Sequence, residues 1–265
     1  MRTALFRSYT AFSTLLVLAM TSPAKADVTG NLSLVSDYAF RGISQTWERP
    51  AIQGGFDYTH PSGFYLGTWA SNVSGNSFAN ASMEWDFYGG YNWKVNDDFS
   101  VNAGLLQYYY PGGKTAPVAP NDKYDTLEAY IGATWKWINL KYSHTLTDYF
   151  GVSSTGLTPC NFATGICDPT NGNSKGSGYV ELNINYELPQ KFMLGFHVGH
   201  QKVRHYGNLD YTDYKLSVTK ELAGFNVGLA YVDTDADENY YTGVVNGDRA
   251  ELSDGRVILS VGKTF

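Results

Sequence analysis

Between Gly178 and Arg204 the chain alternates apolar and polar residues along two arms that flank one short turn. The apolar residues of the first arm stand at every second position: Val180, Leu182, Ile184, Tyr186 and Leu188. After the turn at Leu188–Lys191, the second arm repeats this alternation from Phe192 to Val198. A period of two predicts β-strands, and each arm has about ten to twelve residues, the length that a tilted strand needs to cross a bilayer.

The composition of the chain points to the same class. Of its 265 residues, 43% are hydrophobic and only 17% are charged, and there are 21 Tyr and 28 Gly. After the N-terminus no run of ~18 consecutive apolar residues occurs, which argues against a transmembrane helix. A chain that is poor in charge, rich in Tyr and Gly and without a long helical pattern is typical of an outer-membrane barrel.

The N-terminus has the pattern of a secretory signal peptide. Arg2 and Arg7 are positive, Ala11–Met20 is apolar, and Ala24–Ala26 forms an A-x-A cleavage site. We therefore expect residues 1–26 to be removed and residues 27–265 to form a single barrel domain. The loss of three positive charges changes the formal charge from -6 to -9, so nucleic acid is not an expected partner.

Twelve segments with this alternation follow one another, which predicts an all-β fold, an antiparallel transmembrane β-barrel in the bacterial outer membrane. The segments are Val28–Tyr38, Ala51–Thr59, Phe64–Val73, Ser82–Lys94, Phe99–Tyr109, Tyr124–Trp137, Ile138–Tyr149, Tyr179–Leu188, Lys191–Val203, Tyr211–Lys220, Phe225–Asp233 and Gly255–Phe265. Tight turns alternate with longer loops, the longest of which is Phe150–Gly178. This asymmetry predicts short periplasmic turns, longer extracellular loops and periplasmic termini.

The alternation also assigns the side chains of each strand to a face. We expect these apolar residues to face lipid: Phe56, Leu66, Trp85, Phe87, Val101, Leu105, Ile131, Leu140, Leu216, Val218, Val227, Leu229, Val257, Leu259 and Val261. We expect these charged residues to face inward and line a pore: Asp37, Asp57, Glu84, Asp86, Glu128, Lys136, Lys141, Glu181, Glu187, Asp213, Lys215 and Asp233. Buried ions are costly unless they are paired or hydrated, so this set predicts a wet or ion-paired interior.

A soluble β-sandwich or a lipocalin-like barrel, with its apolar face inside, is the competing interpretation. Strand length, the signal peptide and the turn asymmetry together argue against it. Aromatic residues also gather at strand ends, as in the interfacial girdles of membrane barrels. Glycines inside strands, at Gly54–Gly55 and Gly89–Gly90, are expected to permit bends or close packing.

Three segments carry a resemblance to a known family: Ser36–Thr46 (SDYAFRGISQT), Pro50–Tyr58 (PAIQGGFDY) and Gly63–Val73 (GFYLGTWASNV). Together they resemble the N-terminal signature of the TorF-type porins, a family of proteobacterial conserved hypothetical proteins, and a weaker match continues at Trp85–Tyr91. The resemblance implies an outer-membrane pore, with no catalytic residues to carry over. The terminal Phe265 resembles the signal by which barrels engage the barrel assembly machinery, although Lys263 interrupts the alternation before it.

Cys160 and Cys167 are the only cysteines, and both lie in the longest loop. In an oxidising compartment they predict a local disulfide. A ring this short should stabilise the fold by at most ~2 kcal/mol. With two thiols and no nearby His, neither a metal nor another cofactor is expected.

Two further sequence patterns bear on chemical function, one on metal binding and one on catalysis. The acidic segment Asp233–Asn239 has the spacing of a calcium-binding loop, but it lacks the glycine and the final glutamate of such a loop. A solvated acidic loop is therefore the better interpretation, and weak binding of divalent cations stays an open alternative. Ser143 and His144 are neighbours on one strand and so face opposite sides, while His197 has inward parity. No catalytic constellation is recognisable, and an enzyme is not expected.

The sequence therefore predicts a pore for passive diffusion of small hydrophilic solutes or ions. Carboxylates outnumber lysines in the inward set, which favours cations or neutral solutes. Arg41 either sits at the mouth or crosses to an interior carboxylate such as Asp37.

Two alternative functions stay open for the barrel. One is a non-conducting barrel that is closed by inward tyrosines (Tyr65, Tyr88, Tyr108 and Tyr130), and the other is a hydrolase, which an inward Ser or Asp near His197 would favour. The solute and the oligomeric state are not defined by the sequence.

Overall fold

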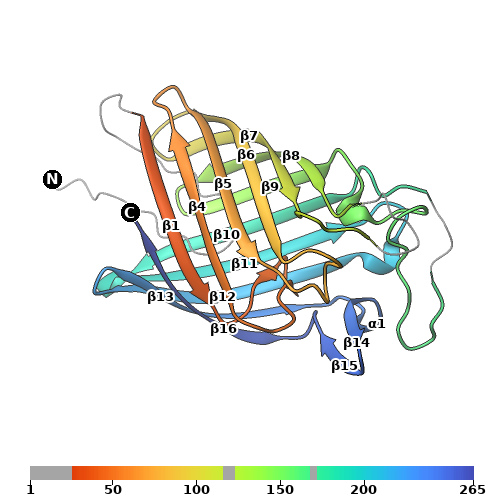
Figure 1. Ribbon diagram of the computed structural model, residues 1–265. Coiled ribbons are helices and arrows are strands. Elements are labelled where there is room, and N and C mark those ends of the chain that lie inside the picture. Colours follow the sequence, from red (N-terminus) through yellow and green to blue (C-terminus); the bar gives the residue numbers. More distant parts are fainter. Residues whose placement is uncertain (1–25, 116–122, 168–171) are drawn as a thin grey trace.

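The computed structural model describes residues 26–115, 123–167 and 172–265. Twelve long antiparallel strands close into a barrel, and their order around the barrel follows their order in the chain (Figure 1). They are β1 (Asp27–Val35), β4 (Ala51–Thr59), β5 (Phe64–Asn72), β6 (Met83–Lys94), β7 (Phe99–Tyr109), β8 (Thr126–Trp135), β9 (Ile138–Thr145), β10 (Gly178–Leu188), β11 (Phe192–Lys202), β12 (Tyr211–Leu222), β13 (Phe225–Thr234) and β16 (Arg256–Thr264). β16 closes the barrel by pairing with β1, where Ser33 stands opposite Gly262.

The predicted fold class is therefore confirmed. The largest error in a strand end is at β9, which stops at Thr145 rather than at Tyr149. The signal-peptide prediction falls on residues outside the described ranges, apart from Ala26, and stays a prediction.

The two ends of the barrel differ, as Figure 1 shows. At the turn end, where β1 begins and β16 ends, the connections are short, and one of them is the 3-10 helix η2 (Pro189–Lys191). The loop end carries all the other small elements: β2 (Ala39–Phe40), β3 (Ile43–Ser44), η1 (Tyr149–Gly151), η3 (Gly207–Leu209), α1 (Glu238–Tyr241), β14 (Thr242–Val245) and β15 (Asp248–Glu251). Within the described ranges, no helix has the length and apolar character to span a membrane.

The outer wall of the barrel is apolar. Among the predicted lipid-facing residues, Val101 and Val218 are partly covered and all the others are exposed. On β13 exposed Phe225, Val227 and Leu229 alternate with buried or inward residues. A continuous exposed apolar belt of this kind needs lipid around it, and a closed sheet leaves no unpaired edge in that lipid. The barrel is a transmembrane barrel.

Glycines of the inner wall make room for tyrosine rings from neighbouring strands. Three such pairs stand directly opposite each other: Tyr65–Gly90, Tyr88–Gly67 and Tyr130–Gly104. A Cβ added to any of these glycines would overlap the ring or the hydroxyl of its tyrosine. Small residues in these strands are therefore needed for packing across the pleat, with the aromatic ring covering the glycine.

The structure joins Cys160 to Cys167 by a disulfide in the loop between β9 and β10, where both residues are exposed. The paired Cys160→Ser, Cys167→Ser variant should lower the free energy of unfolding by about 2 kcal/mol or less, because the closed ring is short. Urea unfolding of the barrel in detergent measures this difference. A larger loss would show that the disulfide supports the barrel itself and not only its own loop.

Candidate functional site

The first long loop, between β1 and β4, folds into the barrel. β2 and β3 form a small hairpin within it, and the turn of that hairpin has positive φ at Arg41 (47°) and Gly42 (83°). A Cβ on Gly42 would overlap the side chains of Thr234 and Asp213 on the inner wall, so this position needs glycine both for its φ and for its close approach. The hairpin tip therefore touches the wall at β12 and β13.

The base of this hairpin is fixed by Asp37. Its carboxylate accepts hydrogen bonds from the hydroxyls of Ser44 and Thr46, each at 2.7 Å. Arg256, from β16, pairs with the other carboxylate oxygen at 3.0 Å. Because three segments of the chain meet on one buried carboxylate, the loop is held inside the barrel by charge-assisted hydrogen bonds.

Arg41 spans the interior from this hairpin. Its Nη2 donates to both carboxylate oxygens of Glu128 on β8, at 3.0 and 2.8 Å, and its Nη1 donates to Oε1 of Gln201 on β11 at 2.8 Å. The guanidinium carbon lies 4.1 Å from the centroid of the Tyr179 ring and 4.8 Å from that of Phe40. The open alternative for Arg41 is thus resolved: it crosses to an interior carboxylate, and that carboxylate is Glu128 rather than Asp37.

A second interior network lies on the inner faces of β9 to β12. Lys141 pairs with Glu181 at 2.5 Å, and Asn183 donates to the other oxygen of Glu181 at 2.9 Å. The Oδ1 of Asn183 in turn lies 2.7 Å from Nδ1 of His197. Lys215 lies close enough to Glu181 for that charge to act on it. These contacts make a continuous polar chain across four strands.

His197 joins this chain to Asp213. Its Nε2 lies 2.8 Å from Oδ2 of Asp213, while the Tyr179 hydroxyl donates to Oδ1 of Asp213 at 2.7 Å. Both ring nitrogens of His197 therefore face oxygen atoms of neighbouring side chains. An inward Asp near His197 was the condition for the hydrolase alternative. In the described part of the chain, however, the polar neighbours of the ring are Asn183, Asp213, Tyr179 and Glu181, and they include no serine, threonine or cysteine nucleophile.

The structure places most of the predicted inward residues on the inner wall. The buried ones are Asp37, Glu84, Asp86, Glu128, Glu181 and Asp213. Asp57, Lys141 and Lys215 are partly buried on the same wall, whereas Glu187 has inward parity but is exposed beside the turn end. Their role as pore-lining residues is a matter of function, which their positions alone do not establish.

Two of the predicted inward residues were placed wrongly. Lys136 lies in the turn after β8, which ends at Trp135, and its half-exposed side chain pairs with Asp98 at 3.6 Å. Asp233 shares the outer face of β13 with Tyr231, whose hydroxyl donates to it at 2.9 Å. Val227 and Asp233 are six positions apart, so an unbroken strand puts both on one face.

The sequence-based set also missed two cations, Arg41 and Arg256. Parity identifies Arg256, because it shares a face with Ile258 and Ser260, both of which are buried. Arg41 lies outside the regular strands, and no local pattern reports where its loop folds. With both arginines counted, four of the six buried carboxylates of the described chain have a basic partner: Asp37 with Arg256, Glu128 with Arg41, Glu181 with Lys141, and Asp213 with His197.

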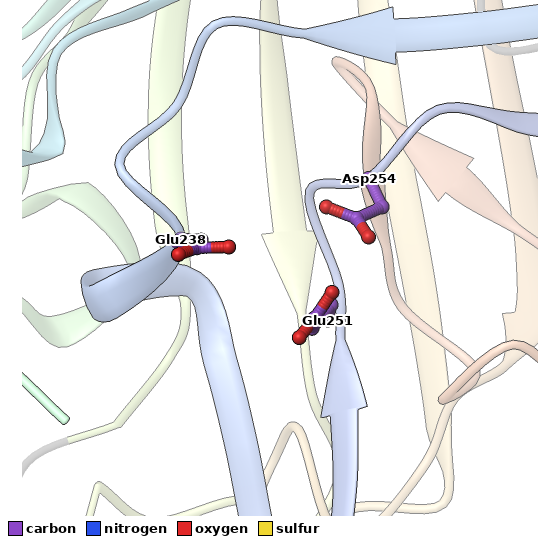
Figure 2. Close-up of side chains that lie close together, drawn as sticks. All are labelled: Glu238, Glu251 and Asp254. Atoms are coloured by element: carbon purple, nitrogen blue, oxygen red, sulfur yellow. The ribbon is translucent and has the colours of Figure 1, made fainter. Parts of the chain in front are cut away.

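A separate group of carboxylates lies at the loop end, outside the barrel interior. Figure 2 shows Glu238 of α1, Glu251 at the end of β15 and Asp254 close together, and their carboxylate oxygens lie within 4.8 Å of one another. A hydrogen bond with Asp254 raises the pKa of Glu251, and Arg249 pairs with Glu251 at 2.7 Å. Exposed acids with a shared proton and a basic neighbour are stable in water, so this cluster does not require a metal ion.

Comparisons with solved structures place the fold among bacterial porins. The structure of the KdgM porin in complex with disordered oligogalacturonate superposes with a TM-score of 0.50 at 8% identity, covering 91% of this chain and 99% of that chain. The NanC porin superposes with a TM-score of 0.50 at 11% identity, covering 90% of this chain and 98% of that chain. At such low identities these likenesses show the fold alone. Among curated proteins, a sequence search found no match.

A sequence-family comparison complements the fold. The family model described as a bacterial protein of unknown function, Gcw_chp, matches residues 19–265. Its description does not contain the TorF-type name, which stays a hypothesis. A closed bacterial barrel with an apolar belt resides in the outer membrane, with its long loops outside the cell. By the extent of the match, the chain belongs to the Gcw_chp family of bacterial proteins of unknown function.

Proposed function

We propose that this barrel is an outer-membrane channel of the TorF type, through which small hydrophilic solutes and ions diffuse passively, with a preference for cations or neutral solutes. The observation that carries the proposal is the inner wall, where charged side chains of β4 to β12 face the interior of a closed transmembrane barrel. Buried charge is costly in a membrane, so an interior of this kind suits a hydrated path rather than a dry core. The likeness to two porins supports the same function.

The proposed cation preference now rests on particular residues rather than on a count. Most interior carboxylates are neutralised by basic partners, as described above. Asp57, Glu84 and Asp86 have no basic partner in the described part of the chain, and all three lie on the wall formed by β4 to β6. When ionised, these acids raise the local concentration of cations along that wall.

The same proposal extends to partners. Outer-membrane lipid contacts the apolar belt, and the barrel assembly machinery recognises the C-terminal Phe265. The backbone of Phe265 pairs with Gly30 through two hydrogen bonds of 2.8 and 2.9 Å, which completes the seam between β1 and β16. The channel has no catalytic role and needs no cofactor.

Conductance across a planar bilayer tests the proposal directly. The mature chain is refolded in detergent, and the single-channel current and the reversal potential are measured under a salt gradient. Steady conductance with a cation-directed reversal potential is the expected result. A silent barrel that is folded by circular dichroism would contradict the channel.

The paired Glu181→Gln, Glu187→Gln variant should lower the cation preference. It removes two negative charges from the inner wall and leaves Lys141 without its partner, so the reversal potential shifts toward anions. Glu251→Gln, which changes a partly buried residue of the β14–β15 hairpin outside the barrel interior, is the matched control and should leave selectivity unchanged. Unchanged selectivity in the paired variant would remove both glutamates from the conducting path.

A non-conducting barrel is the second candidate function, and one observation favours it. Side chains cross the interior at two places: Arg41 joins β8 and β11, and the hydroxyls of Tyr65 and Tyr130 meet at 2.6 Å between β5 and β8. If these contacts close the interior of the barrel to solutes, the barrel does not conduct and its long loops serve recognition at the cell surface. The conductance experiment separates the two functions, since only the open channel carries current.

A further inference from the structure

Two acidic residues of β6 stand apart from the four other buried carboxylates of the described chain. Glu84 and Asp86 are two positions apart, so they share the inner face of the strand, and they are only 1% and 7% exposed. Ser71 stands opposite Glu84 on β5, and Tyr108 stands opposite Asp86 on β7. Two acids are thus enclosed between hydroxyl-bearing neighbours.

In the described residues, the hydrogen bonds to the carboxylates of this pair come from tyrosine hydroxyls, and Trp69 stands opposite Asp86 on β5. The hydroxyl of Tyr38 donates to Glu84 at 3.1 Å, and Tyr110 forms a second hydrogen bond with Glu84. Within the described ranges, Oδ1 of Asp86 is buried and has no hydrogen-bond partner. The charges that act on Asp86 are those of Glu84 and Glu128, which are also negative.

This arrangement leaves two buried acids without a basic partner in the described part of the chain. The four other buried carboxylates of the described chain each have a basic partner, so the interior does supply counter-charges where they are needed. Glu128 is already neutralised by Arg41, and therefore that arginine is not free to serve Asp86. An isolated buried carboxylate is unfavourable, and an orphaned acceptor beside a second carboxylate indicates a missing positive ligand.

We propose that Glu84 and Asp86 bind one divalent cation of the Ca²⁺ class. Carboxylate and hydroxyl oxygens are the ligands that this class prefers, and two negative charges match its charge. The Tyr38 hydroxyl donates to Glu84, and Ser71 and Tyr108 stand opposite Glu84 and Asp86 on the neighbouring strands, so hydroxyl oxygens are at hand as further ligands. In the described part of the chain, the groups that bond to or act on the pair are tyrosine hydroxyls and carboxylates, with no His or Cys among them, which argues against a zinc-type site. The site goes beyond the proposed channel, because the cation is held whether or not current flows.

Equilibrium binding to the intact barrel tests the site. The refolded mature chain is stripped with EDTA and titrated with CaCl₂ in a calorimeter, with separate titrations of MgCl₂ and NaCl. We expect saturable Ca²⁺ binding that Asp86→Asn and Glu84→Gln each weaken by more than about tenfold, since each removes one charged ligand. Glu251→Gln is the control, because it disrupts the exposed acidic cluster of Figure 2 and should leave this binding intact.

Stability gives a second readout that does not depend on calorimetry. In EDTA, Asp86→Asn should unfold at a higher temperature than the parent chain, because it removes a buried acid that has no basic partner, and added Ca²⁺ should raise the unfolding temperature of the parent chain and of Glu251→Gln but not that of Asp86→Asn. Ca²⁺ affinity unchanged by Asp86→Asn, binding lost in Glu251→Gln, tighter binding of Na⁺ than of Ca²⁺, or no binding to a folded barrel would each overturn the site. None of these results involves current, so a silent channel and a failed cation site are distinct outcomes.

Discussion

Replacing Arg41 by alanine is expected to lower the free energy of unfolding by about 3–5 kcal/mol, because it leaves Glu128 buried without its counter-charge. Both side chains are almost fully enclosed, at 7% and 2% exposure, so solvent screens the loss only weakly. The variant also frees Gln201 and removes the guanidinium from the Tyr179 ring. Urea unfolding in detergent, followed by tryptophan fluorescence, measures the change.

Two comparisons make this result specific to the ion pair. The double variant Arg41→Ala, Glu128→Gln should be more stable than Arg41→Ala alone, since the unpaired charge is gone. Arg249→Ala should cost less than about 1 kcal/mol, because its pair with Glu251 lies at the surface. If the effects of Arg41→Ala and Glu128→Gln simply add, the buried pair is not what fixes the loop.

The Arg41→Ala variant also bears on function. Arg41 connects the inserted hairpin with β8 and β11, so its loss both removes a side chain from the path and loosens the loop. For the proposed channel, single-channel conductance should rise and cation preference should increase, because a positive charge leaves the interior.

The barrel itself was predictable from the sequence because its cause is local. Alternation with a period of two, strand lengths near those of a tilted span and short turns at one end are each readable within a few residues. The strand ends were less accurate. β9 stops at Thr145, where the chain leaves the wall and Phe150 turns inward to pack on Phe40 and Tyr108, and no alternation reports that departure.

The interior contacts depend on positions far apart in the sequence. Arg41 meets Glu128 and Gln201 across separations of 87 and 160 residues, and these distances are set by barrel closure, not by a local motif. Parity gave the correct face for the inward carboxylates within strands, but it could not give their partners. The simple count of carboxylates against lysines thus overstated the free negative charge, which the structure concentrates on one wall.

The two misplaced residues, Lys136 and Asp233, have different causes. Lys136 was assigned to a face although its strand had already ended, and periodicity has no meaning in a turn. Asp233 was taken as inward because it is charged, against the alternation of its own strand. On the outer face at the loop end, it lies where headgroups and water begin, so a carboxylate hydrogen-bonded to Tyr231 is tolerated there.

Gly104→Ala is expected to destabilise the barrel by about 1–3 kcal/mol through overpacking. Its new Cβ would overlap the hydroxyl of Tyr130, which bonds to the Tyr65 hydroxyl at 2.6 Å, and Asn102 donates to that same Tyr65 oxygen at 3.0 Å. The methyl group also meets the carbonyl oxygen of Gly89, which the sheet holds in place. Neither neighbour can move without breaking a contact of its own.

A matched control separates this clash from the general cost of losing a glycine. Gly207→Ala adds a Cβ with no heavy atom within 4 Å, and it should change the free energy of unfolding by less than about 0.5 kcal/mol. In a Tyr130→Ala background the overlaps with the hydroxyl and with the ring carbon Cζ are both gone, so Gly104→Ala should cost less than in the parent chain. Equal costs in both backgrounds would show that Tyr130 does not pack over Gly104, and the interior bridge between β5 and β8 would then lose its structural basis.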